Sequence, residues 1–147
     1  MSTITVVNVR NQQQGPAGAK YVYVGRKCGK YDASPLGNPF HLTVDTPEER
    51  KKVVAQYADW LDLQMRNPAS PARKEIERLA ALVKDGHDLY LGCWCAPKAC
   101  HGWVVANTVG DLVMTWEARE EQNAYAHLQC EWTLNYDRHL SDALIDF

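Results

Sequence analysis

The run "HDLYLGCW" at residues 87–94 most constrains the fold, because it is short and almost wholly apolar. A strand of this kind is typical of a parallel sheet that is covered on both faces. A loop with three cysteines and one histidine, "CWCAPKACH", begins inside the run. The run therefore predicts an α/β protein and places a chemically distinctive loop at the end of a buried strand.

The rest of the chain predicts further strands and helices around this run. Strands are expected at 3–10 and 21–25, a long loop at 26–41, and helices at 45–67, 70–86 and 99–128, the last broken near Gly110. This order is typical of an α/β fold. We expect a small three-layer Rossmann-like domain, with a mostly parallel sheet flanked by helices.

The two middle helices carry clear start signals. Asp45 or Thr46 can cap the first, and Ser70 can cap the second. A proline follows each cap in the first turn, where a missing N–H is tolerated. Gly86 is expected to end the second helix. The tail at 129–147 has no clear period and is interpreted as a short helix over the sheet or as a dimer contact.

Length and composition predict one soluble domain. The chain has 147 residues, of which 46% are hydrophobic and 23% charged, as in ordinary globular proteins. The net charge of −2 excludes a global basic field for nucleic acid. With neither a membrane-spanning apolar run nor a signal-peptide pattern, we expect the cytoplasm. Five cysteines in a reducing compartment indicate thiols or metal ligands rather than disulfides.

The candidate site lies where two strands end. The loop after 21–25 and the loop after 87–94 leave strand ends, and ligands bind there in open α/β sheets. We expect Arg26, Asn38 and His101 to meet there with Cys95.

The cysteines and the histidine allow three interpretations. Cys93, Cys95, Cys100 and His101 have the chemistry of zinc ligands, although Cys93 and Cys95 would point to opposite faces of a strand. The second interpretation is a ligand pocket or active site, since a helix start near Cys100 would attract anions and activate a thiol. The third is structural packing, because buried cysteine behaves as a small apolar residue.

The loop at 26–41 carries its own candidates. Arg26 follows the strand-ending Gly25 and can bind a carboxylate or phosphate through its planar group of donors. In "SPLGNPF", Gly37 permits a tight turn and Asn38 precedes a proline, so the loop can present an amide to a polar ligand. The alternative is an asparagine that bonds only its own backbone.

Together these segments resemble an uncharacterised domain family that is common in phages and scattered in bacteria. Its motifs, G-R…S-P-L-G-N-P-F and C-W-C-x-P-x-x-C-H-G, stand here as Gly25-Arg26, Ser34–Phe40 and Cys93–Gly102. The resemblance covers about residues 4–109, within a single domain at 1–147 whose C-terminal extension is 110–147. It implies a family of unknown function. N-glycosidase-like domains are a looser analogy.

One position departs from that family. The residue after C-H-G is commonly acidic there, and here it is Trp103. The resemblance thus favours a binding protein over a catalyst, and Trp103 can stack a base.

The leading hypothesis is a domain that binds a nucleotide or nucleoside-like ligand and can act on the nucleotide or its N-glycosidic bond, as a hydrolase or transferase. Candidate catalytic residues are His101, Cys100 and Cys95, and candidate ligand-binding residues are Gly25, Arg26, Gly37, Asn38, Phe40, Trp94 and Trp103. This hypothesis needs no cofactor. The alternative is a zinc-stabilised phage accessory protein that contacts a host or phage protein, or DNA, in the host cytoplasm. Membrane contact is not expected, and an oligomer stays open.

Overall fold

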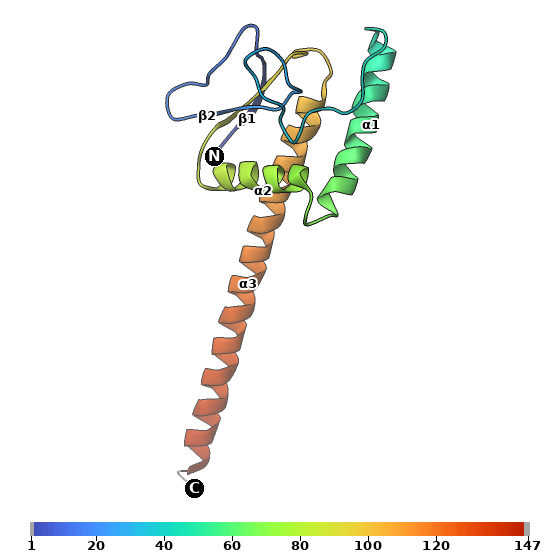
Figure 1. Cartoon of the computed structure of the whole chain (residues 1–147). Helices are drawn as coiled ribbons and strands as arrows, with labels where there is room; N and C mark the ends of the chain where they lie inside the picture. The colour runs from blue at the N-terminus through green and yellow to red at the C-terminus, as the bar shows by residue number, and fades with distance from the viewer. Residues whose placement is uncertain (1, 146–147) are drawn as a thin grey trace. The chain divides into compact units, whose positions relative to one another are not determined.

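The computed structural model describes the backbone of residues 2–145 and the side chains of residues 2–131 (Figure 1). Its elements, in chain order, are β1 (Ile4–Asn8), β2 (Lys20–Tyr23), α1 (Pro47–Met65), α2 (Pro71–Lys84), β3 (Leu89–Cys93) and α3 (His101–Ile145). The predicted α/β class and the parallel sheet are confirmed, because both strand pairings are parallel.

The three-stranded sheet has the order β1-β3-β2, so the last strand in sequence lies in the centre. In register, Leu91 of β3 is paired with Val6 on one side and Val22 on the other. Leu89, Leu91 and Cys93 are fully buried. The apolar run that predicted a covered strand therefore forms the middle of the sheet.

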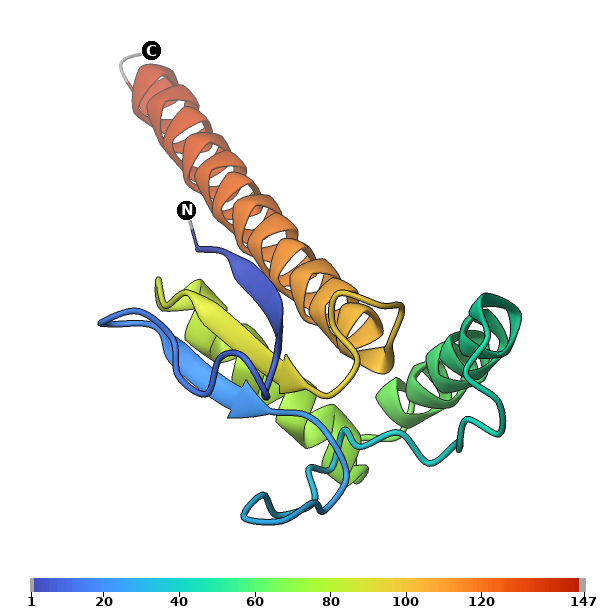
Figure 2. The ribbon, with the colours of Figure 1, turned by 90° about the horizontal axis from the view of Figure 1, so that it is seen from above.

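The helix α2 lies along one face of this sheet (Figure 2). It contacts β3, and its apolar side, including Ile76 and Leu79, is fully buried. On the opposite face the connection between β1 and β2 approaches the sheet. The hydroxyl of Tyr21 donates to the carbonyl of Gln12 at 3.0 Å. A Cβ at Gly15 would lie 3.2 Å from the Tyr90 ring, so this connection passes close over the strands.

Both predicted helix caps form. The hydroxyl oxygen of Thr46 accepts from the N–H of Glu49 at 3.2 Å, and that of Ser70 accepts from the N–H of Arg73 at 3.4 Å. Inside α1, the buried Tyr57 donates its hydroxyl to the carbonyl of Leu36 at 2.6 Å. This bond ties the long loop between β2 and α1 to the helix.

The predicted break near Gly110 is wrong, because α3 continues through it to Ile145. Val105, Val109 and Val113 are buried on this part of the helix and hold it in place. The contacts within the chain define two units, Met1–Val113 and Met114–Phe147. The second unit, described by itself, continues the same helix as far as Ile145, so most of the aperiodic tail is helical. A dimer contact through side chains beyond residue 131 lies outside the described side chains.

Among the described residues, no helix is long and apolar enough to cross a bilayer.

Gly110→Ala should stabilise the fold. A Cβ at Gly110 would meet no atom within 4 Å, and alanine is favoured over glycine in a helix by about 0.5–1 kcal/mol. Denaturant unfolding should show a gain of that size. The matched control is Gly86→Ala, which should destabilise, because Gly86 ends α2 with a φ of +96°. A loss of stability in Gly110→Ala would contradict this account of the helix.

Candidate functional site

A cavity of about 380 Å³ opens where β2 and β3 end, beside α1 and the start of α3. Its walls combine basic, aromatic and thiol side chains with an aliphatic patch. The basic members are Arg26, Lys27 and Arg50, the aromatic ones Tyr23, Phe40 and Trp94, the thiols Cys28, Cys95 and Cys100, and the aliphatic ones Leu42, Val53 and Val54. No carboxylate lines it among the described residues, so the wall favours an anion.

Most residues that the sequence nominated meet at this cavity. The lining includes Gly25, Arg26, Asn38, Phe40, Trp94, Cys95, Cys100 and His101. Gly37 and Trp103 are not part of it. A Cβ at Gly37 would lie 3.1 Å from the carbonyl oxygen of Gly25, so Gly37 lets the two loop segments approach each other. Trp103 is 45% exposed, in the first turn of α3.

Arg26 and Asn38 both have partners within the loop. A guanidinium nitrogen of Arg26 lies 2.6 Å from Nδ1 of His41, which must accept because arginine only donates. The Asn38 side-chain oxygen accepts from the N–H of Phe40 at 2.9 Å. Asn38 thus makes the backbone bond that turns commonly use, and it lines the cavity as well.

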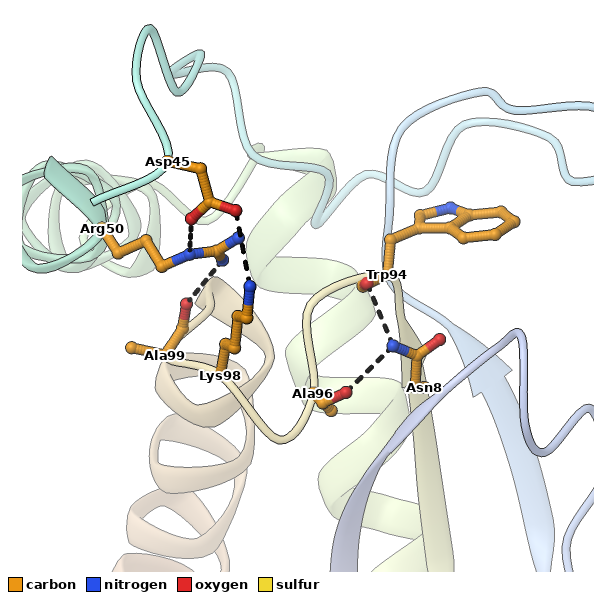
Figure 3. A network of polar contacts seen from close by, with 7 residues as sticks. All are labelled: Asn8, Asp45, Arg50, Trp94, Ala96, Lys98 and Ala99. Atoms are coloured by element: carbon orange, nitrogen blue, oxygen red, sulfur yellow. Dashed lines mark hydrogen bonds and ion pairs between the residues drawn. The ribbon is translucent and has the colours of Figure 1, made fainter. Parts of the chain in front are cut away.

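The segment 94–100, which we call the cysteine loop, is held on one side by Asn8 (Figure 3). The Asn8 amide donates to the carbonyl of Trp94 at 3.1 Å and to that of Ala96 at 2.9 Å. Asn8 is the last residue of β1. One side chain thus satisfies two backbone carbonyls and fixes the loop to the edge of the sheet.

Arg50 holds the other side of the cysteine loop, from the first turn of α1 (Figure 3). Its guanidinium donates to the carbonyl of Ala99 at 3.4 Å and to the carboxylate of Asp45 at 2.5 Å. Lys98 lies 3.5 Å from the other oxygen of Asp45. Arg50 lines the cavity. Its side chain is only 14% exposed, so solvent and salt screen its charge weakly.

Three thiols converge inside this frame, and we call Cys93, Cys95 and Cys100 the thiol cluster. The Sγ atoms of Cys93 and Cys100 are 3.2 Å apart. Cys95 lines the same cavity as Cys100 and Arg50 and interacts electrostatically with both. The expectation that Cys93 and Cys95 point apart is therefore wrong. Residues two positions apart on a strand lie on the same face, and the strand ends at Cys93, so nothing in the backbone directs the two side chains apart.

The three pKa values diverge because the thiols share protons. Hydrogen bonding from Cys100, then from Arg50, lowers the pKa of Cys95 to about 5. A bond from Cys100, joined by backbone N–H groups of Cys95 and Ala96, lowers the pKa of Cys93 to about 7. The pKa of Cys100 is raised well above its ordinary range, because its proton serves both neighbours. The cluster thus favours a thiolate at Cys95 and a protonated Cys100.

His101 is buried, and it does not face the thiols with its Nε2. That atom lies 2.7 Å from the carbonyl of Val24, to which it donates. The ring meets Tyr57 edge-on, with centroids 5.0 Å apart. Burial lowers the pKa of His101, and the nearby Arg26 cation lowers it further. A neutral imidazole with its proton on Nε2 therefore leaves Nδ1 as an acceptor.

Aromatic side chains form the wall beside β2. The Trp94 indole N–H donates to the hydroxyl of Tyr23 at 2.9 Å. The Tyr31 ring lies 4.5 Å from that of Tyr23 and 6.1 Å from that of Trp94, centroid to centroid. The Arg10 guanidinium lies 5.7 Å from the Trp94 ring centroid. Trp94 is thus held in place by contacts from separate segments, and 36% of it is exposed.

The sequence did not nominate Arg50, Asn8 or Lys27. Arg50 looks like an ordinary polar residue in a helix, and its partners Asp45 and Ala99 belong to other segments. The one available signal was the cap region, since Asp45 precedes a helix start by two positions. Cys28, which no motif singled out, also lines the cavity.

The zinc hypothesis gains no geometric support. Within the described side chains, no group of three or more His, Cys, Asp or Glu residues is arranged to hold a metal ion. Nε2 of His101 bonds the carbonyl of Val24, so only its Nδ1 could serve as a ligand.

Removing Arg50 should make Cys95 harder to ionise. In Arg50→Ala, the thiolate loses a cationic donor, so the pH midpoint of iodoacetamide labelling at Cys95 should move upward. Peptide mapping across pH measures this midpoint. The exposed Arg66, which pairs with Asp62, provides the control variant Arg66→Ala, with an unchanged midpoint. An equal midpoint in Arg50→Ala would contradict the assigned role.

His101 should make stability depend on pH. Its pKa is lowered in the folded chain, so the unfolded chain binds a proton first as pH falls below about 6.5. Stability should therefore be retained above that value and fall as pH drops toward the lower folded pKa. Unfolding curves of His101→Gln should show a flatter dependence in this window. A His101→Gln chain with the same pH dependence as the parent chain would contradict this account.

Comparison with known proteins identifies a family. No curated protein and no solved structure matches the chain. A family profile described as "Domain of unknown function (DUF4326)" matches residues 7–111. This region holds every residue that lines the cavity. The expected family of unknown function is found, while the two motifs as its definition and its phage distribution stay predictions. The chain belongs to the DUF4326 family of domains of unknown function.

Proposed function

We propose that this domain binds an anionic, nucleotide-like ligand in the cavity at the ends of β2 and β3. The observation that carries the proposal is the composition of one wall. Three cationic side chains and three aromatic ones line the same space, without a carboxylate among the described residues. A volume of about 380 Å³ lies within the range of roughly 300–1,000 Å³ that is usual for small-molecule sites.

The basic side chains supply the anion end. Arg50 is nearly buried and fixed by Asp45, so it can offer donors without a large ordering cost. Arg26 is exposed and held by His41, and Lys27 is next to it in the chain. Phosphate groups of a nucleotide fit donors of this geometry and charge.

The aromatic side chains supply the base end. Trp94 and Phe40 present apolar surface to the cavity, and Tyr23 holds the indole of Trp94 through its hydroxyl. Bases stack on fixed aromatic rings with about 1–3 kcal/mol each. Asn38 at the same wall can read a polar edge of the base with its amide.

Chemistry on a bound ligand would fall to Cys95 and His101. Cys95 provides a thiolate beside Arg50, and the neutral His101 provides Nδ1 as a base. An enzyme acting on a nucleotide or on its N-glycosidic bond is the form of the proposal that uses both groups. Cys100 acts through Cys95 by keeping a proton next to it.

Ligand binding should depend on the positive charge of Arg50. We expect one or more ribonucleotides to raise the melting temperature of the full chain, and Arg50→Ala to weaken binding about tenfold or more, as for loss of a charge-assisted hydrogen bond. Isothermal titration at two salt concentrations measures this, and higher salt should weaken binding. Arg66→Ala, outside the cavity, should bind like the parent chain.

Failure of a broad panel of nucleotides and nucleosides to shift the melting temperature would overturn the proposal. Equal ligand affinity of Arg50→Ala and the parent chain would show that the ligand does not bind at Arg50. The zinc-stabilised accessory protein, and a phage protein acting in the host cytoplasm, remain predictions. Stoichiometric zinc in native mass spectra, lost together with the fold on chelation, would support that alternative.

A further inference from the structure

The thiol cluster contains two cysteines that could form a disulfide, Cys95 and Cys100, and a third, Cys93, next to Cys100. The Sγ atoms of Cys93 and Cys100 lie 3.2 Å apart, and Cys95 and Cys100 line the same cavity. Cys95 and Cys100 are the two ends of the six-residue segment CAPKAC. A bond between them would close only this short segment.

The three thiols differ in access. Cys93 is fully buried and Cys100 is 4% exposed, whereas Cys95 is partly exposed and lines the cavity. A small solute in the cavity therefore meets Cys95 first. Cys100 also lines the cavity, but with 4% of its surface exposed it is less accessible than Cys95.

Arg50 adds a charge to this arrangement. It lines the cavity with Cys95, and Asp45 and the carbonyl of Ala99 hold its guanidinium in place. A cation beside a sulfur favours the thiolate, which is the form that reacts with peroxides. Cys28 and Cys130 are exposed, and among the described side chains neither sulfur has a hydrogen bond from a cation.

We propose that the thiol cluster is a peroxide-oxidised site, at which Cys95 is the sulfur attacked first and Cys100 closes a Cys95–Cys100 disulfide. The co-reactant is a hydroperoxide, such as hydrogen peroxide. The inference rests on the cluster alone and does not depend on what occupies the cavity.

The first step transfers one oxygen atom. The Cys95 thiolate attacks the outer oxygen of the peroxide, an S–O bond forms and the O–O bond breaks. The sulfur is oxidised by two electrons to a sulfenic acid. The leaving hydroxide takes the proton that Cys95 released on ionising and departs as water.

The second step closes the disulfide. The Cys100 sulfur attacks the Cys95 sulfur, so that an S–S bond forms and the S–O bond breaks. The leaving hydroxide takes the proton that Cys100 carried and departs as a second water. Cys93, 3.2 Å from Cys100, can accept this proton in passing. Reduction by a dithiol restores the two thiols.

The test is oxidation of the full-length, reduced chain by hydrogen peroxide, followed by intact mass and peptide mapping. We expect a mass lower by two hydrogen atoms and a Cys95–Cys100 linkage, formed about tenfold or more faster than any oxidation at Cys130. Because the parent chain is mapped directly, this readout does not depend on a variant that folds. Oxidation of Cys130 before the cluster would overturn the proposal.

Two variants assign the roles of the sulfurs. Cys100→Ser should stop at the sulfenic acid, trapped at Cys95 by dimedone, and Cys95→Ser should lose the fast phase. Cys130→Ser should oxidise like the parent chain. A Cys95→Ser chain that forms a Cys93–Cys100 disulfide at the parent rate would overturn the assignment. So would a zinc ion held by the thiols in native mass spectra, because metal-bound thiolates are not free to react in this way.

Discussion

The conformation of the cysteine loop is the constraint on which the candidate site depends. Asn8 fixes two of its carbonyls from the sheet, and Arg50 fixes a third from α1. Backbone carbonyls that turn away from water need such partners. With both anchors in place, the loop folds back on the end of β3, and the three sulfurs meet. Asn8 only anchors the loop. Arg50 anchors the loop and also brings a positive charge to the cavity that Cys95 and Cys100 line.

Charge at the site is balanced locally. Arg50 lies between the Asp45 carboxylate and the Cys95 sulfur, so its positive charge is partly satisfied before any ligand arrives. Arg26 instead contacts a histidine ring, and its charge remains available to the cavity. An incoming anion would compete with Asp45 and Cys95 for Arg50, whereas Arg26 could turn to it at smaller cost. The cavity thus combines a tightly held cation with a more loosely held one.

Local signals in the sequence predicted every strand and helix, but not the length of the last helix. The apolar run at β3, the Thr46 and Ser70 caps and the stop at Gly86 all appear in the structure. Gly110 suggested a break that does not form, because glycine lowers helix propensity but the buried valines around it decide the outcome.

At the site, strand ends placed Arg26, Cys95 and His101 on one rim. Arg50 and Asn8 could not be found, since their roles arise from bonds across 49 and 86 or more positions. Residues two apart on a strand share a face, so the expectation that Cys93 and Cys95 point apart misapplied the alternation rule.

The central position of β3 also sets the order in which the domain can assemble. During synthesis both edge strands emerge first, but each is bonded to β3 and therefore lacks its partner until residue 93 has appeared. Pairings over so many residues are slow to form, because a long loop must close before any contact repays it. The cysteine loop follows β3 directly and is anchored to β1 by Asn8. The same event that completes the sheet therefore brings the sulfurs together, and a nascent chain would carry separated, ordinary thiols until that moment.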